Sequence, residues 1–203
     1  MFYQAGCLAA RRICYTRVMA TEEESHAREL LGRSSAYAKR AVELLLADER
    51  LKGRVAPTLK SAIEVEIGRF HLFLIFSALQ DKDHQAKTFF QRVHDSLREQ
   101  FLALEARRLK GLRDELTGVE NGDQIWKGLE AEKDPLEPYY GSFDGGCKTI
   151  EDSPFGVVAR LVSSRFFPEE SVSVAYETVL SITLDSGDRV TREIDEIRNA
   201  GET

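Results

Sequence analysis

The sequence changes character at Gly118, and this change constrains the fold more than any other feature. Before Gly118, apolar residues recur at the three- and four-residue steps of amphipathic helices. After it come stretches rich in Gly, Pro and acids, and then a tail of alternating apolar residues. Bases exceed acids by four before the change, and acids exceed bases by ten after it, which together give the net charge of −6. We therefore predict an α+β protein with a helical body and an acidic appendage.

Residues 21–118 are predicted to form the helical body, as three long antiparallel helices. Thr21 precedes three glutamates, a pattern that places a capping hydroxyl and acidic side chains at a helix start. A second helix is expected over residues 57–79, where the run 70–76 is apolar on every face and must be buried on all sides. A third helix follows from Asp83 and is the longest of the three.

The apolar run of the second helix is too short to cross a bilayer. Roughly 20 consecutive apolar residues are needed for a transmembrane helix. Here Glu64, Glu66 and Arg69 interrupt the pattern upstream. The sequence predicts no membrane span.

Residues 119–153 are predicted to form an acidic loop region with one short helix. Asp123 can cap that helix, whose apolar positions include Ile125 and Leu129. The remainder, residues 134–152, is predicted to be loop. Residues 154–203 form the last predicted unit. In it, residues 154–165 fit either a helix that Ser153 caps or a strand.

The C-terminal tail is predicted to end in a β-hairpin. Apolar residues occupy every second position of its first strand, at Val172, Val174, Tyr176, Thr178, Leu180, Ile182 and Leu184. Period-two alternation is typical of a half-buried strand. Turn residues follow at 185–188, and residues 189–197 can return as the second strand. A strand of this length with one partner would leave an open edge, which either another chain or a helix at residues 154–165 would cover.

Residues 1–20 are predicted to be an N-terminal arm or a targeting segment. They contain Arg11, Arg12 and Arg17 but no acidic residue, a bias that is typical of organelle targeting. The three cysteines, Cys7, Cys14 and Cys147, have neither metal-site spacing nor a disulfide pattern. We expect a cytoplasmic location, or an organelle matrix if the first segment is a targeting signal.

The sequence offers little catalytic chemistry. Cys147, beside Lys148, is the weak candidate for a nucleophile, and no histidine lies near it in the sequence. Glu23 and His26 form a single Glu-x-x-His pair, whereas a di-iron bundle needs two. We therefore expect no metal and no cofactor. His71 is predicted to be a buried, hydrogen-bonded core residue.

The sequence favours a non-catalytic interaction or assembly subunit over an enzyme. Its predicted contact surfaces are the basic end of the third helix (Arg107, Arg108, Lys110 and Arg113) and the hairpin (Val172, Val174 and Tyr176). The predicted partner is another protein or a second copy of the chain. The acidic balance argues against nucleic acid, whose phosphates require bases. The alternative is an enzyme or small-ligand-binding protein with a pocket between the helices.

Overall fold

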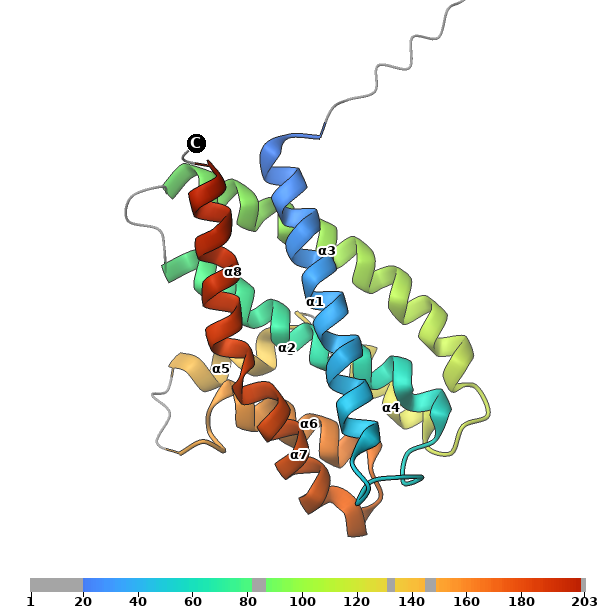
Figure 1. The fold of residues 1–203 in the computed structure, drawn as a ribbon. Coiled ribbons are helices and arrows are strands. Elements are labelled where there is room, and N and C mark those ends of the chain that lie inside the picture. Colours follow the sequence, from blue (N-terminus) through green and yellow to red (C-terminus); the bar gives the residue numbers. More distant parts are fainter. Residues whose placement is uncertain (1–19, 82–86, 131–133, 145–148, 202–203) are drawn as a thin grey trace, which may run out of the picture.

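A computed structural model describes residues 20–81, 87–130, 134–144 and 149–201, and these residues are all-helical (Figure 1). The prediction of an α+β fold is therefore wrong. Three long helices form the body of the molecule. Shorter helices from the second half of the chain pack against this body, and the C-terminal helix α8 lies next to α1 (Figure 1).

The first helix, α1 (Glu22–Ala47), begins at the predicted cap. Thr21 Oγ1 accepts a hydrogen bond from the Glu24 amide at 3.2 Å, and the Glu24 carboxylate accepts one from the Thr21 amide at 3.1 Å. This reciprocal pair satisfies two backbone donors that the first helical turn leaves free. The predicted stripe is buried along the helix, including Leu30, Tyr37 and Leu45.

The second helix, α2 (Lys60–Asp81), follows a short 3₁₀ turn at Pro57–Leu59 and is the most deeply buried of the three long helices. Phe70, Phe73 and Phe76 are all 1% exposed or less, as its all-round apolar sequence predicts. Across the described residues, no helix combines the length and apolar character that a membrane span requires.

The third helix, α3 (Lys87–Leu116), runs parallel to α1 and antiparallel to α2. Its direction relative to α1 follows from two contacts: Gln100 reaches the Glu24 carbonyl, and Arg108 reaches Ser35. The helix ends before Gly118, which adopts the left-handed φ of +80° that glycine tolerates best.

The described residues of the acidic region form two helices, where the sequence predicted one. The first, α4 (Gly122–Glu130), confirms the predicted short helix. The second, α5 (Glu137–Asp144), lies where a loop was predicted. Asp134 stabilises its start by accepting a hydrogen bond from the Leu136 amide at 3.0 Å. Tyr139 then places its hydroxyl in the core, so a tertiary contact stabilises a helix with weak local signals.

The ambiguous segment after Ser153 is a helix, α6 (Pro154–Phe166). The Ser153 hydroxyl accepts a hydrogen bond from the Gly156 amide at 3.3 Å, and Pro154 occupies the first turn. Both features belong to the helical alternative. The helix packs against α2, α5 and α7.

No β-hairpin follows; the tail forms α7 (Val172–Leu184) and α8 (Ser186–Gly201), with a 3₁₀ turn at Glu169–Ser171 before them. The residues between the alternating apolar positions explain the error. These odd-numbered residues fall into two sets, each with a spacing of four residues. One set is buried (Ala175, Val179 and Thr183), and the other is exposed (Ser173, Glu177 and Ser181). A buried side and an exposed side that each repeat every four residues are typical of an α-helix, and most of the even-numbered apolar residues lie between these two sides.

The predicted return strand is also helical. In α8, Val190, Ile194 and Ile197 are buried at steps of four and three, and they cover α2. The residues predicted to form the hairpin turn instead join α7 directly to α8: the Ser186 hydroxyl donates to the Thr183 carbonyl at 2.5 Å. The open strand edge that was predicted to pair with another chain does not exist.

Candidate functional site: a basic cavity between three helices

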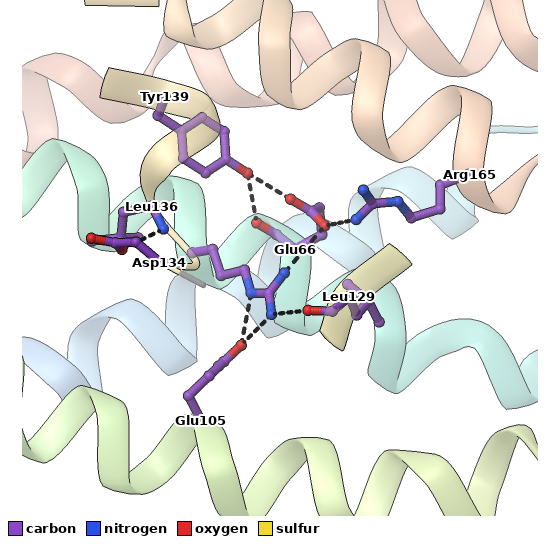
Figure 2. A network of polar contacts seen from close by, with 8 residues as sticks. Glu66, Glu105, Leu129, Asp134, Leu136, Tyr139 and Arg165 are labelled. Atoms are coloured by element: carbon purple, nitrogen blue, oxygen red, sulfur yellow. Dashed lines mark hydrogen bonds and ion pairs between the residues drawn. The ribbon is translucent and has the colours of Figure 1, made fainter. Parts of the chain in front are cut away.

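One cluster of charge in the described residues is a buried ionic network centred on α2 (Figure 2). The Arg69 guanidinium contacts Glu105 on α3 through Nε at 2.7 Å, and it also donates to the Leu129 carbonyl at 3.1 Å. Glu66 accepts hydrogen bonds from Arg165 at 2.6 Å and from the Tyr139 hydroxyl at 2.7 Å. Five helices, α2 to α6, therefore contribute to a single network.

This network is closed and balanced in charge. Its two arginines face its two glutamates, and Glu66, Arg69 and Glu105 are each 4% exposed or less. Buried charges are tolerated only when paired and hydrogen-bonded, and here both conditions hold. The network attaches the shorter helices to the three-helix body. We assign it a structural role, because its charged groups are already used by one another.

The second cluster lines a cavity of about 360 Å³ between α1, α2 and α3, which we call the basic cavity. Its charged and hydroxyl side chains are Ser35 and Lys39 from α1, Ser61 and Glu64 from α2, and Arg107, Arg108 and Glu115 from α3. Ala38, Val65, Gly111 and Leu112 complete its walls. The volume is within the range of ligand pockets in proteins.

The cations of the basic cavity have no acidic partner. Among the residues that the structure describes, no carboxylate lies within ion-pair distance of Lys39, Arg107 or Arg108. Other arginines do find partners: Arg92 lies 2.7 Å from Glu23, and Arg98 lies 3.0 Å from Asp134. Three unneutralised bases around one cavity can attract an anionic group, and they outnumber the two acidic side chains, Glu64 and Glu115, that also line it.

Arg108 is held in place before any ligand binds. Its Nη2 donates to the Ser35 hydroxyl at 2.8 Å, and that hydroxyl in turn donates to the Leu31 carbonyl at 3.0 Å. Gly68 on α2 lies beside the same guanidinium: a Cβ atom added to this glycine would lie 3.9 Å from Arg108 Nη1. A guanidinium that is already oriented loses less conformational entropy when it binds a carboxylate or phosphate.

A second cavity, of about 430 Å³, lies between α1 and the junction of α7 with α8, but its arginines are engaged. Arg40 lies 3.5 Å from Glu43, and Arg189 lies 3.9 Å from Glu193. Arg192 Nε donates to the carbonyl of Asp188 at 3.3 Å. Arg192 therefore has the same kind of backbone contact as Arg107, which donates to the Ala103 carbonyl at 3.1 Å. The two cavities differ in that two of the three arginines of the second cavity face carboxylates, whereas no cation of the basic cavity does so among the described residues.

The predicted contact residues of the third helix divide into two groups. Arg107 and Arg108 line the basic cavity, whereas Lys110 is exposed on α3 and is not part of the cavity wall. Arg113 instead lies over the Trp126 ring, with Cζ 5.8 Å from the centroid, so it also holds α4 against α3. Sequence reasoning missed Ser35 and Lys39, because nothing in α1 indicates that this helix packs beside the end of α3.

The other predicted site residues do not form a site. Val172, Val174 and Tyr176 are partly buried on α7, and Val174 and Tyr176 pack against the core. Cys147 lies outside the described residues. Within the described part of the chain, no group of three or more His, Cys, Asp or Glu side chains could hold a metal ion.

His71 is fully buried, as predicted, but it is not hydrogen-bonded. Neither ring nitrogen has a partner among the described residues. The imidazole stacks on Tyr37, with ring centroids 4.2 Å apart. Burial, and to a smaller extent the positive charge of Arg189, lowers the pKa of His71 to about 3, so the ring is neutral at physiological pH.

No protein-family model, curated protein or solved structure matches this chain.

Proposed function

We propose that this protein is a non-catalytic interaction subunit that binds an acidic segment of a partner protein at the basic cavity. The observation that carries the proposal is the set of unpaired cations, Lys39, Arg107 and Arg108, around one hollow. Complementary charge steers two proteins together and selects between partners. Arg108, already oriented by Ser35, is the natural anchor for a carboxylate.

The positive surface extends beyond the cavity, which favours a protein partner over a small anion. Arg107 and Lys110 are exposed and lie three residues apart on α3, so they share one side of the helix. The chain's own acidic half is a competing occupant. However, the cavity is lined only by residues of α1, α2 and α3, and no described residue after Gly118 belongs to it.

The proposed compartment is the cytoplasm, or an organelle matrix if residues 1–20 direct the chain there. An acidic partner protein is available in either place, so the proposal does not depend on the choice.

Two charge-matched triple variants test the proposal. The first carries Lys39→Gln, Arg107→Gln and Lys110→Gln, and these three side chains have no ion pair in the described structure. The control carries Arg28→Gln, Lys127→Gln and Arg160→Gln, which are equally exposed but lie outside the cavity. Both variants lose three positive charges. A difference between them therefore reports position and not net charge.

Each protein is immobilised and used to capture partners from an extract of its source cells. We expect the wild type and the control to retain a stoichiometric acidic protein, with retention that falls as salt is raised. The cavity variant should bind that protein roughly ten- to hundredfold more weakly, since each exposed charge pair contributes about 0.5–1 kcal/mol. Equal retention by the two triple variants would contradict the proposal.

A further inference from the structure

A stripe of exposed residues runs along the outer side of α3, away from the basic cavity. Its members recur at steps of four and three residues, so they share one side of the helix. The cavity residues Arg108, Gly111 and Glu115 lie on the opposite side, because 3.6 residues complete a turn. The members of this outer stripe are Asp95, Glu99, Leu102, Ala106, Lys110 and Arg113, and together they cover roughly 27 Å of helix.

The outer stripe changes character along its length. Its first two residues are acids, its central two are apolar, and its last two are bases. At its centre, Leu102 is 45% exposed, the highest value for a large apolar side chain in the described part of the chain. The stripe therefore has an apolar middle with acidic and basic ends.

Within the described residues, the charged ends of the outer stripe are not neutralised. Glu99, Lys110 and Arg113 form no ion pair there, and Asp95 forms one only with the ring of His94, at 3.3 Å. Asp95 and Glu99 are also like charges four residues apart, which is unfavourable on an isolated helix. These charges are therefore available to another molecule.

The outer stripe is complementary to a second copy of itself in the antiparallel direction. Asp95 and Arg113 each lie nine residues from Leu104, and Leu102 and Ala106 each lie two residues from it. A two-fold axis at the level of Leu104 therefore places Asp95 opposite Arg113 of the second copy. It also places Leu102 opposite Ala106 of the second copy, whose small side chain leaves room for the leucine.

The remaining two residues of the outer stripe complete this match. Glu99 lies five residues before Leu104, and Lys110 lies six residues after it, so the two are neighbours across the axis. A parallel arrangement would instead place acids against acids and bases against bases, which is repulsive. The charges therefore select one direction of pairing.

We infer that two copies of the protein associate through their outer stripes, as antiparallel α3 helices related by a two-fold axis at the level of Leu104. A contact with this symmetry contains every residue pair twice. The inference does not rest on the proposed function, because the basic cavity lies on the other side of α3 and stays open in the dimer. Lys110 is the one stripe residue that also belongs to the positive surface beside the cavity.

Two charge reversals and their combination test the pairing in the full chain. Glu99→Lys and Lys110→Glu each place like charges opposite one another at two positions. A variant with both changes restores opposite charges everywhere, and so does an equimolar mixture of the two single variants. Sedimentation velocity between about 1 and about 500 µM measures the self-association of each protein.

We expect the wild type to dimerise with a dissociation constant on the order of 10–100 µM, because a single helix pair is smaller than a standard interface. Each single reversal should weaken the dimer by roughly ten- to hundredfold. The combined variant and the mixture should recover most of the wild-type affinity.

The apolar centre of the outer stripe has a matched control on α7. Leu102 and Leu184 are 45% and 44% exposed, so glutamine at either position should leave the fold and the net charge unchanged. Circular dichroism checks the fold. We expect Leu102→Gln to weaken the dimer by about tenfold and Leu184→Gln to have no effect.

Three results would overturn the inference. The first is a wild-type chain that is still monomeric at about 500 µM. The second is self-association that the single reversals do not weaken, or that Leu184→Gln weakens as much as Leu102→Gln, since the contact then lies elsewhere. The third is failure of the combined variant to recover, because Glu99 then does not face Lys110 of the second copy.

Discussion

The buried network and the basic cavity share the helices α2 and α3 and use the same types of charged residue, but only the charges of the network are paired. Glu105 of the network and Arg108 of the cavity are only three residues apart on α3. In the network, every charge has found a partner inside the protein, and five helices are held together as a result. In the cavity, the charges face a hollow and remain unpaired. The paired charges therefore have a structural role, and the unpaired charges are the ones that remain available to the ligand we propose.

Removing one charge from the network should produce the largest effect on stability. Arg69→Met leaves the Glu105 carboxylate buried without its cation, a change that typically costs about 3–5 kcal/mol. Arg108→Gln in the cavity should cost less than about 1 kcal/mol, because that side chain is partly exposed and forms one neutral hydrogen bond. Urea denaturation of both variants measures the difference. Equal losses would show that the distinction between the two clusters is wrong.

His71 provides a test of a buried polar group that, unlike the network, has no partner. Its folded-state pKa of about 3 lies below the value of roughly 6.5 in an unfolded chain, so the unfolded state binds the proton more readily. The contribution of His71 to stability is therefore full above pH 6.5 and is lost as pH falls toward 3. Between pH 6.5 and pH 5 the loss is about 2 kcal/mol.

The variant His71→Phe keeps a flat ring against Tyr37 and removes the titrating group. We expect its free energy of unfolding to change by about 2 kcal/mol less than that of the wild type between pH 6.5 and pH 5, measured in urea at each pH. Parallel pH profiles for the two proteins would contradict the assignment of His71 as a neutral buried ring.

Two glycines that differ only in their relation to the cavity give the smallest expected effect. Gly32 in α1 and Gly111 in α3 are both helical, and a Cβ atom at either would meet no atom within 4 Å. Alanine at either position should stabilise the protein by about 0.5–1 kcal/mol, since glycine is a poor helix former. Thermal unfolding measures this gain.

Leucine at the same two positions separates stability from binding. Gly111→Leu places a larger side chain in the basic cavity and should weaken binding of an acidic peptide, whereas Gly32→Leu should not. Both variants should remain at least as stable as the wild type. Equal peptide affinity in the two would show that the ligand binds elsewhere.

The features with the strongest local sequence signals were predicted correctly. Thr21 with Glu24 specifies a helix start through contacts with its own backbone neighbours. Ser153 with Pro154 indicated a second helix start, but the sequence left residues 154–165 open between a helix and a strand. The run at 70–76 has no polar face to turn toward water, so its burial follows from composition alone. The sequence also indicated that one end of α3 is basic, because its bases lie close together along one predicted helix.

The errors occur where local patterns are degenerate or where partners are distant in sequence. In α7, β-branched residues satisfy both a strand period and a helical period, and packing against α6 and α1 selects the helix. In α5, the hydrogen bond from the Tyr139 hydroxyl to Glu66 connects positions 73 residues apart. No spacing rule reports such a contact.

The candidate site shows the same division. The basic residues of α3 and the burial of α2 follow from local sequence, because helix caps and apolar periodicity act over one or two turns. The packing of three helices decides which of those bases line a cavity. It also brings Ser35 and Lys39 of α1 beside them. The same packing gives every charge of the buried network a partner and leaves the cations of the cavity without one. A charge acquires its role from the neighbours that tertiary structure brings to it, and these neighbours come from positions far apart in the chain.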